Sequence, residues 1–315
     1  MTDAGYSDSQ GPVLVIGAAG MDIVGRLKGD LQSGSSSPGH IRSSFGGVAR
    51  NVAENLARLG QPVQLLTVIG DDTIGEQLLQ QISSAGVDVS SVQHSFTNPT
   101  GSYLAIIDAS GVLQFALDDM HAIAELSPEY IRDHEQAFDD ASAVFVDANL
   151  SKEALKAVFT LARRYDVPVC ADPTSATLAS CLTPYLNQLY LVTPNSHEAM
   201  ILCGKDFDPA KPRQALEAAK TLVAQGTEIA IITLAEFGLC YATSETSGHI
   251  PAIRTTVVDP TGAGDALTAA VLYALLNDIT LDDAVRLGLA AASLTLRHRG
   301  AVVPDLSLEK LYDQW

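Results

Sequence analysis

A chain of 315 residues is about twice the usual single-domain length, although one large α/β domain also reaches this size. Hydrophobic residues make up 47% of it, which is enough for a sizeable core and excludes general disorder. The 37 acidic residues outnumber the 19 basic ones and give a formal net charge of −18. Such a surface repels phosphate backbones and anionic lipids, so we expect neither nucleic acid nor a membrane as partner.

The cysteines and the chain ends carry no structural or targeting signal. The four cysteines are far apart and form no C-x-x-C pair, which argues against zinc and against a disulfide framework. No apolar run reaches the ~18 residues that a membrane helix needs. Residues 1–11 are polar and lack the features of a signal peptide. We therefore expect a cytoplasmic protein in which residues 1–11 form a disordered tail.

The first half of the chain starts as a strand and helix alternation that is interrupted twice. A Ser/Gly/Pro-rich stretch within residues 23–45 reads as a loop or turn, and two strand-like runs within residues 100–118 read as a hairpin. Apolar spacing predicts the remaining elements as strand or helix. These are a strand at 12–18, a helix at 46–59, a strand at 62–70 and a helix at 74–85.

From residue 140 onward the alternation is regular. Predicted strands lie at 142–148, 167–172, 189–193, 228–234 and, as a pair, near 238–250; predicted helices lie at 151–165, 195–203, 212–226, 263–276 and 281–298. Apolar strands alternating with helices predict an α/β fold with a mostly parallel central sheet covered by helices on both faces. We expect one domain over residues 12–310, with segments 23–45 and 100–118 forming a small β-lid over a site at the strand ends.

The densest chemical signal is the stretch DPTGAGD, residues 259–265, which runs directly into an apolar helix. A glycine turn at a helix start leaves backbone N–H groups free, and the helix dipole adds positive charge there. Gly262, Ala263 and Gly264 are therefore candidates to hold a transferring phosphoryl group. Asp265 is the candidate to accept the proton of an attacking hydroxyl. A capped helix with a glycine turn is the plain structural alternative.

A second signal lies in GGVARNVA, residues 46–53. The pair Gly46 and Gly47 lets a ligand approach the backbone closely, and Asn51 then offers an amide donor and acceptor to a hydroxyl. Asp22, just after the first strand, is a candidate acceptor for a vicinal diol, with an ordinary surface carboxylate as the alternative. The chain contains neither a P-loop nor the G-x-G-x-x-G of a dinucleotide-binding unit, which argues against an NAD-dependent oxidoreductase.

Together these residues resemble the PfkB (ribokinase-like) carbohydrate kinases, over about residues 13–305. Residues 46–53, with glycines following at 60 and 70, match one family signature, and residues 259–265 match the other. Longer stretches are similar to the branch of that family that phosphorylates pseudouridine. These stretches are residues 36–60, 100–120, 146–155 and 192–199.

The resemblance implies a role for each matching position. Asp265 would be the catalytic base and Gly262, Ala263 and Gly264 the anion hole, while the sugar-binding positions would be Asp22, Gly46, Gly47 and Asn51. Because a carboxyl group has an ordinary pKa near 3.9 and a helix start favours its charged form, we expect Asp265 to be a weak base. The candidates for recognising the base of a nucleoside are Ser102 and Tyr103 on the lid hairpin, Asp119 after it, and Asn149 and Asp172 at strand ends. Asn149 is preferred, because an amide at the end of an apolar strand would face the site.

The nucleotide side of the site is implied in the same way. Asn195 and Glu198 match the pair that organises Mg²⁺ and the nucleotide phosphates, largely through water. Thr233 and Gly238 match nucleotide contacts, and Asp259 and Thr261 match a monovalent-cation site, expected for K⁺. The sequence departs from the family pattern at three positions, where Asn, Gly and Thr are more usual: Gly20, Ala235 and Pro260.

The expected reaction is transfer of the γ-phosphate of ATP, with Mg²⁺, to the 5′-hydroxyl of pseudouridine. A kinase of ribose, another sugar or another nucleoside is the nearest alternative. A catalytically silent nucleoside-binding protein on the same fold is the alternative from another class. The exposed lid strands also favour a homodimer, since free strand edges seek partners.

Overall fold

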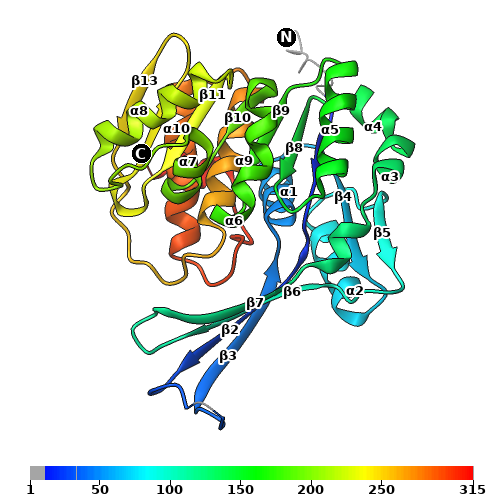
Figure 1. Cartoon of the computed structure of the whole chain (residues 1–315), viewed down its shortest axis with the longest axis vertical. Helices are drawn as coiled ribbons and strands as arrows, with labels where there is room; N and C mark the ends of the chain where they lie inside the picture. The colour runs from blue at the N-terminus through cyan, green and yellow to red at the C-terminus, as the bar shows by residue number, and fades with distance from the viewer. Residues whose placement is uncertain (1–10, 33, 315) are drawn as a thin grey trace, which may run out of the picture.

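The computed structural model describes residues 11–32 and 34–314 (Figure 1). The predicted disordered tail, residues 1–11, lies outside the described residues apart from Gly11. Within these ranges no helix combines the length and the apolar character needed to cross a membrane. All four cysteines are free thiols, and Cys170, Cys203 and Cys240 are buried core residues, in agreement with the absence of a disulfide framework.

A nine-stranded sheet, as far as the described residues show it, forms the centre of the molecule. Its strand order is β13-β12-β11-β10-β9-β8-β1-β4-β5. From β11 to β5 the strands run parallel, and β12 and β13 are antiparallel at one edge. The strands are β1 (Val13–Ile16), β4 (Val63–Gly70), β5 (Val92–Ser95), β8 (Ala143–Asp147), β9 (Val169–Asp172), β10 (Leu189–Val192), β11 (Ile229–Thr233), β12 (Leu239–Ala242) and β13 (Ser247–Ile250).

Helices cover both faces of this central sheet (Figure 1). One face packs against α1 (Val48–Arg58), α2 (Thr73–Ser84), α9 (Ala263–Leu276) and α10 (Leu281–Leu296). The other face packs against α3 (Pro128–Asp133), α5 (Lys152–Arg164), α7 (Ser196–Cys203) and α8 (Pro212–Ala224). Most of the strand residues are Val, Ile, Leu or Ala and are fully buried, because a parallel sheet covered on both faces leaves no side for water.

A second sheet, with order β3-β2-β6-β7 among the described residues, projects from the body below the central sheet (Figure 1). We call it the lid sheet; its strands are β2 (Gly20–Leu27), β3 (Gly39–Gly46), β6 (Gly101–Ile107) and β7 (Leu113–Asp119). It contains the two segments that the sequence placed outside the main alternation. The predicted fold class, a mostly parallel α/β sheet with a small β-structure beside it, is therefore confirmed.

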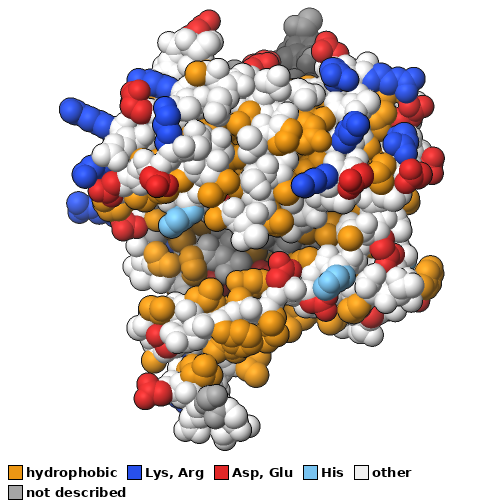
Figure 2. Space-filling view, in the orientation of Figure 1, with side chains coloured by type: hydrophobic (Ala, Val, Ile, Leu, Met, Phe, Trp, Pro, Cys, Tyr) orange, Lys and Arg blue, Asp and Glu red, His pale blue; other side chains and the backbone are white. Residues whose placement is uncertain are grey.

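The two faces of the lid sheet differ in chemistry. Paired residues share a face, so Asp22, Ser44 and Tyr103 lie on one face of the lid sheet. Side chains alternate along each strand, so the neighbours of these residues point to the opposite face. That second face is apolar, and much of it is exposed; Figure 2 shows hydrophobic side chains gathered over the lid. Its members are Ile23, Ile41, Leu104, Ile106, Phe115 and Leu117, of which Ile41 is 80% exposed.

The sequence did not predict several short elements. These are β5, α3, α4 (Glu135–Asp139), α6 (Ala176–Ala179), α11 (Leu308–Tyr312) and the 3₁₀ turns η1 (His121–Glu125), η2 (Ser180–Gln188) and η3 (Ala235–Phe237). Elements of three to six residues carry too few positions for a periodic apolar pattern, and the nine-residue η2 contains Pro184. Local caps hold some of them instead: the Ser127 side chain caps α3, and the Ser175 side chain caps α6.

Candidate active site

Acidic side chains gather where the parallel strands of the central sheet end. Asp147 and Asp172 are the last residues of β8 and β9, and Glu198 lies in the first turn of α7, after β10. The carboxyl ends of parallel strands meet at one edge of a sheet, so these groups share a region. All three are buried, and burial raises the pKa of each. The edge therefore concentrates carboxyl groups that need hydrogen-bond donors.

Helix α9 begins at this edge with bare backbone amides. Its first residue follows Gly262, which has φ +77° and offers no side-chain cap; a Cβ there would lie 2.1 Å from the Ala301 carbonyl oxygen. Among the described residues, nothing accepts a hydrogen bond from the N–H of Gly264 or Asp265, and the space beside Gly264 is open. The Thr268 hydroxyl donates to Thr193 Oγ1 at 2.8 Å and ties α9 to the end of β10. Such a helix start is suited to an anion.

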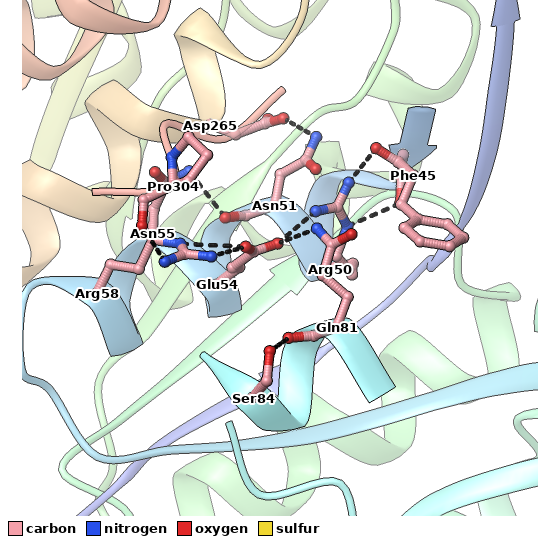
Figure 3. A network of polar contacts seen from close by, with 11 residues as sticks. Phe45, Arg50, Asn51, Glu54, Asn55, Arg58, Gln81, Ser84, Asp265 and Pro304 are labelled. Carbon is pink, nitrogen blue, oxygen red and sulfur yellow. Dashed lines mark hydrogen bonds and ion pairs between the residues drawn. The ribbon is translucent and has the colours of Figure 1, made fainter. Parts of the chain in front are cut away.

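Asn51 and Asp265 meet at the centre of this region, although they are 214 positions apart. The Asn51 side chain donates from Nδ2 to Asp265 Oδ2 at 2.6 Å (Figure 3). Asn51 is 3% exposed, and its Oδ1 has no hydrogen-bond partner among the described residues. A buried acceptor without a donor is costly, so Oδ1 is suited to a ligand hydroxyl. The structure thus brings the two sequence signatures together at one pair of side chains.

The environment of Asp265 raises its pKa to about 7. Burial is the main cause, and the nearby carboxylates of Asp22 and Asp147 add to it. The hydrogen bond from Asn51 and the positive charge of Arg50 act in the opposite direction. The expectation that the helix start would keep Asp265 at an ordinary carboxyl pKa is therefore wrong. A carboxyl group that titrates near neutrality is a better match for accepting a proton at physiological pH.

Asp22 lies at the root of the lid sheet, on strand β2. Burial raises the pKa of Asp22 to about 6, against the positive charge of Arg50. The carboxyl group packs directly on Gly46, where an added Cβ would lie 2.3 Å from Asp22 Oδ1. Gly47 has φ +93°, and its Cβ would lie 2.4 Å from the Ala18 carbonyl oxygen. The two glycines therefore allow Asp22 and the start of α1 to approach each other.

Asp147 is a central residue that sequence reasoning missed. Its Oδ2 accepts from the backbone N–H of Ala18 at 2.8 Å and of Ala49 at 3.1 Å. Its Oδ1 accepts from the backbone N–H and from Nδ2 of Asn149, both at 3.0 Å. Asp147 therefore joins the loop after β1 to the first turn of α1. Asn149, predicted to recognise a base, donates one N–H of its side-chain amide to Asp147, which leaves its second N–H and its Oδ1 for a ligand.

Ser102 is a base-recognition candidate that lies on the far face of the lid sheet from Asp22. It pairs with Met21, and therefore lies on the lid face opposite to Asp22; its hydroxyl donates to the Thr100 carbonyl oxygen at 3.3 Å. The neighbouring Tyr103 pairs with Asp22 and shares its face. Burial and the Asp22 carboxylate raise the pKa of the Tyr103 phenol. Side chains alternate along β6, so only one of these two adjacent residues shares the face of Asp22. The sequence alone did not show which one it is.

Asn195 and Glu198 form a closed hydrogen-bonded unit at the start of α7. Asn195 Oδ1 accepts from the N–H groups of His197 and Glu198, while the Glu198 carboxylate accepts from Asn195 N at 2.8 Å and from its Nδ2 at 2.6 Å. This is a capping box, which stabilises the helix by itself. Within the described ranges no three His, Cys, Asp or Glu side chains are grouped to hold a metal. A magnesium ion fits here only through water and nucleotide phosphates, as Mg²⁺ commonly binds.

The predicted nucleotide contacts lie together at the end of β11. Thr233 forms a bridge with Asn195, and its N–H donates to the Pro194 carbonyl oxygen at 3.0 Å. Gly238 has φ +90°, and its Cβ would lie 2.0 Å from the Ile250 carbonyl oxygen. Ala235, where the family has glycine, adopts φ +50°, a left-handed conformation that glycine reaches without strain. The turn geometry is thus kept despite the substitution.

Asp259, predicted to hold a monovalent cation with Thr261, already has several partners. Its Oδ1 accepts from the Thr261 N–H at 3.1 Å, and its Oδ2 accepts from the Gly300 N–H at 3.3 Å. Arg42, from lid strand β3, forms an ion pair with Oδ2 at 3.3 Å. A guanidinium therefore supplies positive charge at this carboxylate, and a K⁺ ion there would compete with it.

Comparison with known proteins identifies the family. The sequence profile described as pfkB family carbohydrate kinase matches residues 11–307. The chain belongs to this family. It is 32% identical over 297 residues to the pseudouridine kinase of Escherichia coli (strain K12), covering 94% of each chain. It is 29% identical over 297 residues to the guanosine-inosine kinase of Exiguobacterium acetylicum, covering 93% of this chain and 97% of the relative.

A solved structure shows the same fold. The ribokinase of Arabidopsis thaliana, complexed with ribose and ATP, superposes with a TM-score of 0.85 over 96% of this chain and 98% of the ribokinase, at 22% identity. As a pfkB-family kinase, the chain is a phosphotransferase that acts on a hydroxyl group of a sugar or nucleoside. The roles of the individual site residues stay predictions.

Proposed function

We propose that the chain transfers the γ-phosphate of ATP to the 5′-hydroxyl of pseudouridine, giving ADP and pseudouridine 5′-phosphate. The observation that carries the proposal is the Asn51–Asp265 hydrogen bond of 2.6 Å beside the uncapped start of α9. It places a carboxyl group with a pKa of about 7 next to unpaired backbone amides. The likeness to the E. coli pseudouridine kinase supports the choice of acceptor.

The proposed step balances in one displacement. The 5′-oxygen of the acceptor forms a bond to the γ-phosphorus while the bond from that phosphorus to the β,γ-bridging oxygen breaks. The proton of the 5′-hydroxyl passes to the Asp265 carboxylate, and ADP leaves with the bridging oxygen. The amides of Gly262 and Gly264 would bind the transferring phosphoryl oxygens, where charge is spread in the transition state. The Ala263 N–H, which donates to the Pro260 carbonyl oxygen at 3.5 Å, would turn to the phosphate in the complex.

The acceptor would lie between the lid sheet and the start of α1. The Asp22 carboxylate and the unpaired Asn51 Oδ1 are suited to accept hydrogen bonds from the ribose hydroxyls. Gly46 and Gly47 shape this space, because a side chain at either position would collide with the Asp22 carboxyl group or with the Ala18 carbonyl oxygen. We place the base of the nucleoside against Tyr103, which shares the Asp22 face of the lid sheet. An aromatic ring stacks on any nucleobase and does not distinguish one pattern of hydrogen-bond donors and acceptors from another. Specificity for the base therefore needs further polar contacts.

The nucleotide base would occupy an apolar cavity next to the predicted ATP residues. This cavity, about 420 Å³, is lined by Ile250, Pro251, Ile253, Arg286, Leu289 and Gln314. Gly238 packs against its wall at residues 250–252. Mg²⁺ would supply charge neutralisation on the phosphates, with Asn195 and Glu198 oriented toward it through water. Because Arg42 already pairs with Asp259, we expect turnover to change little when K⁺ is replaced by Na⁺.

We also propose a homodimer that forms through the lid sheets. The exposed apolar face with Ile41, Phe115 and Leu117 would be covered by the lid of a second copy, which removes apolar surface from water. The proposed setting is a cytoplasmic enzyme with one domain over residues 12–310, acting on a free nucleoside rather than on nucleic acid or a membrane. Size-exclusion chromatography with light scattering tests the dimer, and Ile41→Asp with Leu117→Asp should shift it to monomer.

An acceptor panel tests the proposed reaction. Pseudouridine, uridine, guanosine, inosine and ribose are offered at equal concentration with ATP and Mg²⁺, and ADP release is measured. The proposal predicts the highest kcat/KM with pseudouridine, no release after chelation of divalent ions, and release slowed by roughly 10²–10⁴-fold in the Asp265→Ala variant. The likeness to a guanosine-inosine kinase makes a purine nucleoside the second candidate. Equal ADP release by wild type and Asp265→Ala would contradict the assignment of Asp265 as the proton acceptor.

A further inference from the structure

A buried network on α1 connects the root of the lid sheet with α2 and the C-terminal loop (Figure 3). Glu54 is its centre and is 1% exposed. It accepts from Arg50 Nη1 at 2.7 Å, from Arg58 Nη2 at 2.6 Å and from Gln81 Nε2 at 3.3 Å. Arg58 also donates to the Pro304 carbonyl oxygen. The two arginines thus share one acidic partner and differ in what else they contact.

Arg50 binds the backbone where the lid sheet meets the body. Its Nε donates to the Gly46 carbonyl oxygen at 3.2 Å, and its Nη2 donates to the Phe45 carbonyl oxygen. Phe45 and Gly46 are the last residues of strand β3, and Gly46 pairs with Gly20 at the start of β2. The Arg50 guanidinium therefore binds the end of strand β3 at Gly46, the glycine whose missing side chain leaves room for the Asp22 carboxyl group.

Arg50 also carries a charge that the surrounding acids need. Among the described residues it is the only Lys or Arg that is buried. The charges of Asp22 and Asp147 raise the pKa of Asp265, and Arg50 is the cation that lowers the pKa of both Asp22 and Asp265. Arg58 lies about two helical turns further along and is not among the causes that shift the pKa of those two acids. A single buried cation, which also pairs with Glu54, thus acts on both Asp22 and Asp265.

We propose that Arg50 is a positioning residue for phosphoryl transfer: it anchors the root of the lid sheet and supplies the positive charge that keeps the Asp22 and Asp265 carboxylates available as acceptors. This inference rests on the proposed function. It assigns a role to a position that the family signature leaves open between Gly47 and Asn51. Arginine suits both tasks because its fork of donors binds several acceptors while its charge persists when buried.

Three variants separate charge from anchoring. Arg50→Gln removes the charge, Arg50→Lys keeps the charge but loses the fork to Phe45 and Gly46, and Arg58→Gln is the matched control that breaks the same Glu54 network. Arg50→Gln should move the midpoint of the rising limb of kcat against pH upward by about one to three units, since that is the effect of one neighbouring opposite charge. Arg50→Lys should keep the wild-type midpoint but raise KM for the acceptor. Arg58→Gln should lower the melting temperature without moving the midpoint.

A measurement without turnover keeps this inference distinct from the proposed reaction. In protein labelled with ¹³C at aspartate carboxyl carbons, NMR titration gives the Asp265 midpoint directly, with Asp265→Asn assigning the signal. The inference predicts an upward shift in Arg50→Gln and none in Arg58→Gln, whether or not pseudouridine is the acceptor. A folded Arg50→Gln variant with the wild-type Asp265 midpoint overturns it. If Arg50→Gln does not fold, an unchanged acceptor KM in Arg50→Lys overturns the anchoring role.

Discussion

Two helices start at the same edge of the central sheet and differ in how their first amides are satisfied. At α7, Asn195 and Glu198 close a capping box in which every polar group has a partner within the turn. At α9, Gly262 offers no side chain, and the amides of Gly264 and Asp265 have no partner in the described part of the chain. The first arrangement stabilises the fold, whereas the second leaves donors for a ligand.

Helix α1 shows a third solution, in which a distant residue supplies the cap. Gly47 gives α1 no side-chain cap, and Asp147 at the end of β8 accepts from the Ala49 N–H instead. The start of α1 is therefore satisfied by tertiary structure and positions Asn51. Only the start of α9, among these three, has unpaired amides beside open space. This difference is why we propose the anion site at α9 and not at α1 or α7.

Asp265→Ala should have the largest effect, because it removes the carboxyl group that we propose as the proton acceptor. We expect turnover to fall by roughly 10²–10⁴-fold, while ATP binding survives since the amides of α9 are unchanged. Steady-state kinetics and calorimetric titration with a non-hydrolysable ATP analogue measure the two quantities. Near wild-type turnover in this variant would contradict the catalytic role of Asp265 and leave α9 with no functional difference from an ordinary helix start.

Two glycines of the α9 turn form a matched pair. Gly262→Ala places a Cβ 2.1 Å from the Ala301 carbonyl oxygen at φ +77°, so it should destabilise the protein by about 2 kcal/mol or more. Gly264→Ala meets nothing within 4 Å, so it should leave the melting temperature unchanged and weaken the use of ATP by entering the ligand space. Thermal unfolding and KM for ATP separate the two. A Gly264→Ala enzyme with wild-type kinetics would contradict the phosphate position.

Glu198→Gln tests the closed helix start. Replacing the carboxylate weakens the capping box, so the free energy of unfolding should fall by about 0.5–2 kcal/mol. Turnover at saturating Mg²⁺ should fall much less than in Asp265→Ala, because Glu198 acts on the phosphates only through water. Equal losses of turnover in both variants, with full stability in Glu198→Gln, would show that the comparison between α7 and α9 is wrong.

The acids at the site should also make stability depend on pH, with the smallest effect of the four. The folded pKa of Asp265 is about 7 and that of Asp22 about 6, both above the value of 3.8 expected when unfolded. Folding then favours the protonated forms, so this stability is complete below pH 4 and is lost as pH rises through 6 and 7. Asp265→Asn should therefore make the ligand-free protein more stable at pH 8, by about 1–2 kcal/mol. Urea unfolding of wild type and Asp265→Asn at pH 5 and pH 8 measures this difference. A variant that is less stable than wild type at pH 8 would contradict the prediction.

The sequence predicted what depends on local pattern. The start of α9 at residue 263 and the choice of Asn51 and Asp265 as site residues follow from motifs that are visible along the chain, whereas the hydrogen bond between the two came only from the structure. Asp147 was missed because its role depends on Ala49 and Ala18, which are 98 and 129 positions away. Arg50 was missed because an Arg with Glu four residues later is the usual pattern of an exposed helix face. Arg50 is buried because α1 packs against other parts of the fold, and the spacing of apolar residues along the helix does not predict that packing.

The most direct test is a structure with Mg²⁺, a non-hydrolysable ATP analogue and pseudouridine. Our account predicts the terminal phosphate about 2.7–3.2 Å from the Gly264 amide nitrogen, and the 5′-hydroxyl about 2.6–3.2 Å from an Asp265 carboxylate oxygen. A terminal phosphate bound away from the start of α9, or an acceptor hydroxyl out of reach of Asp265, would contradict it.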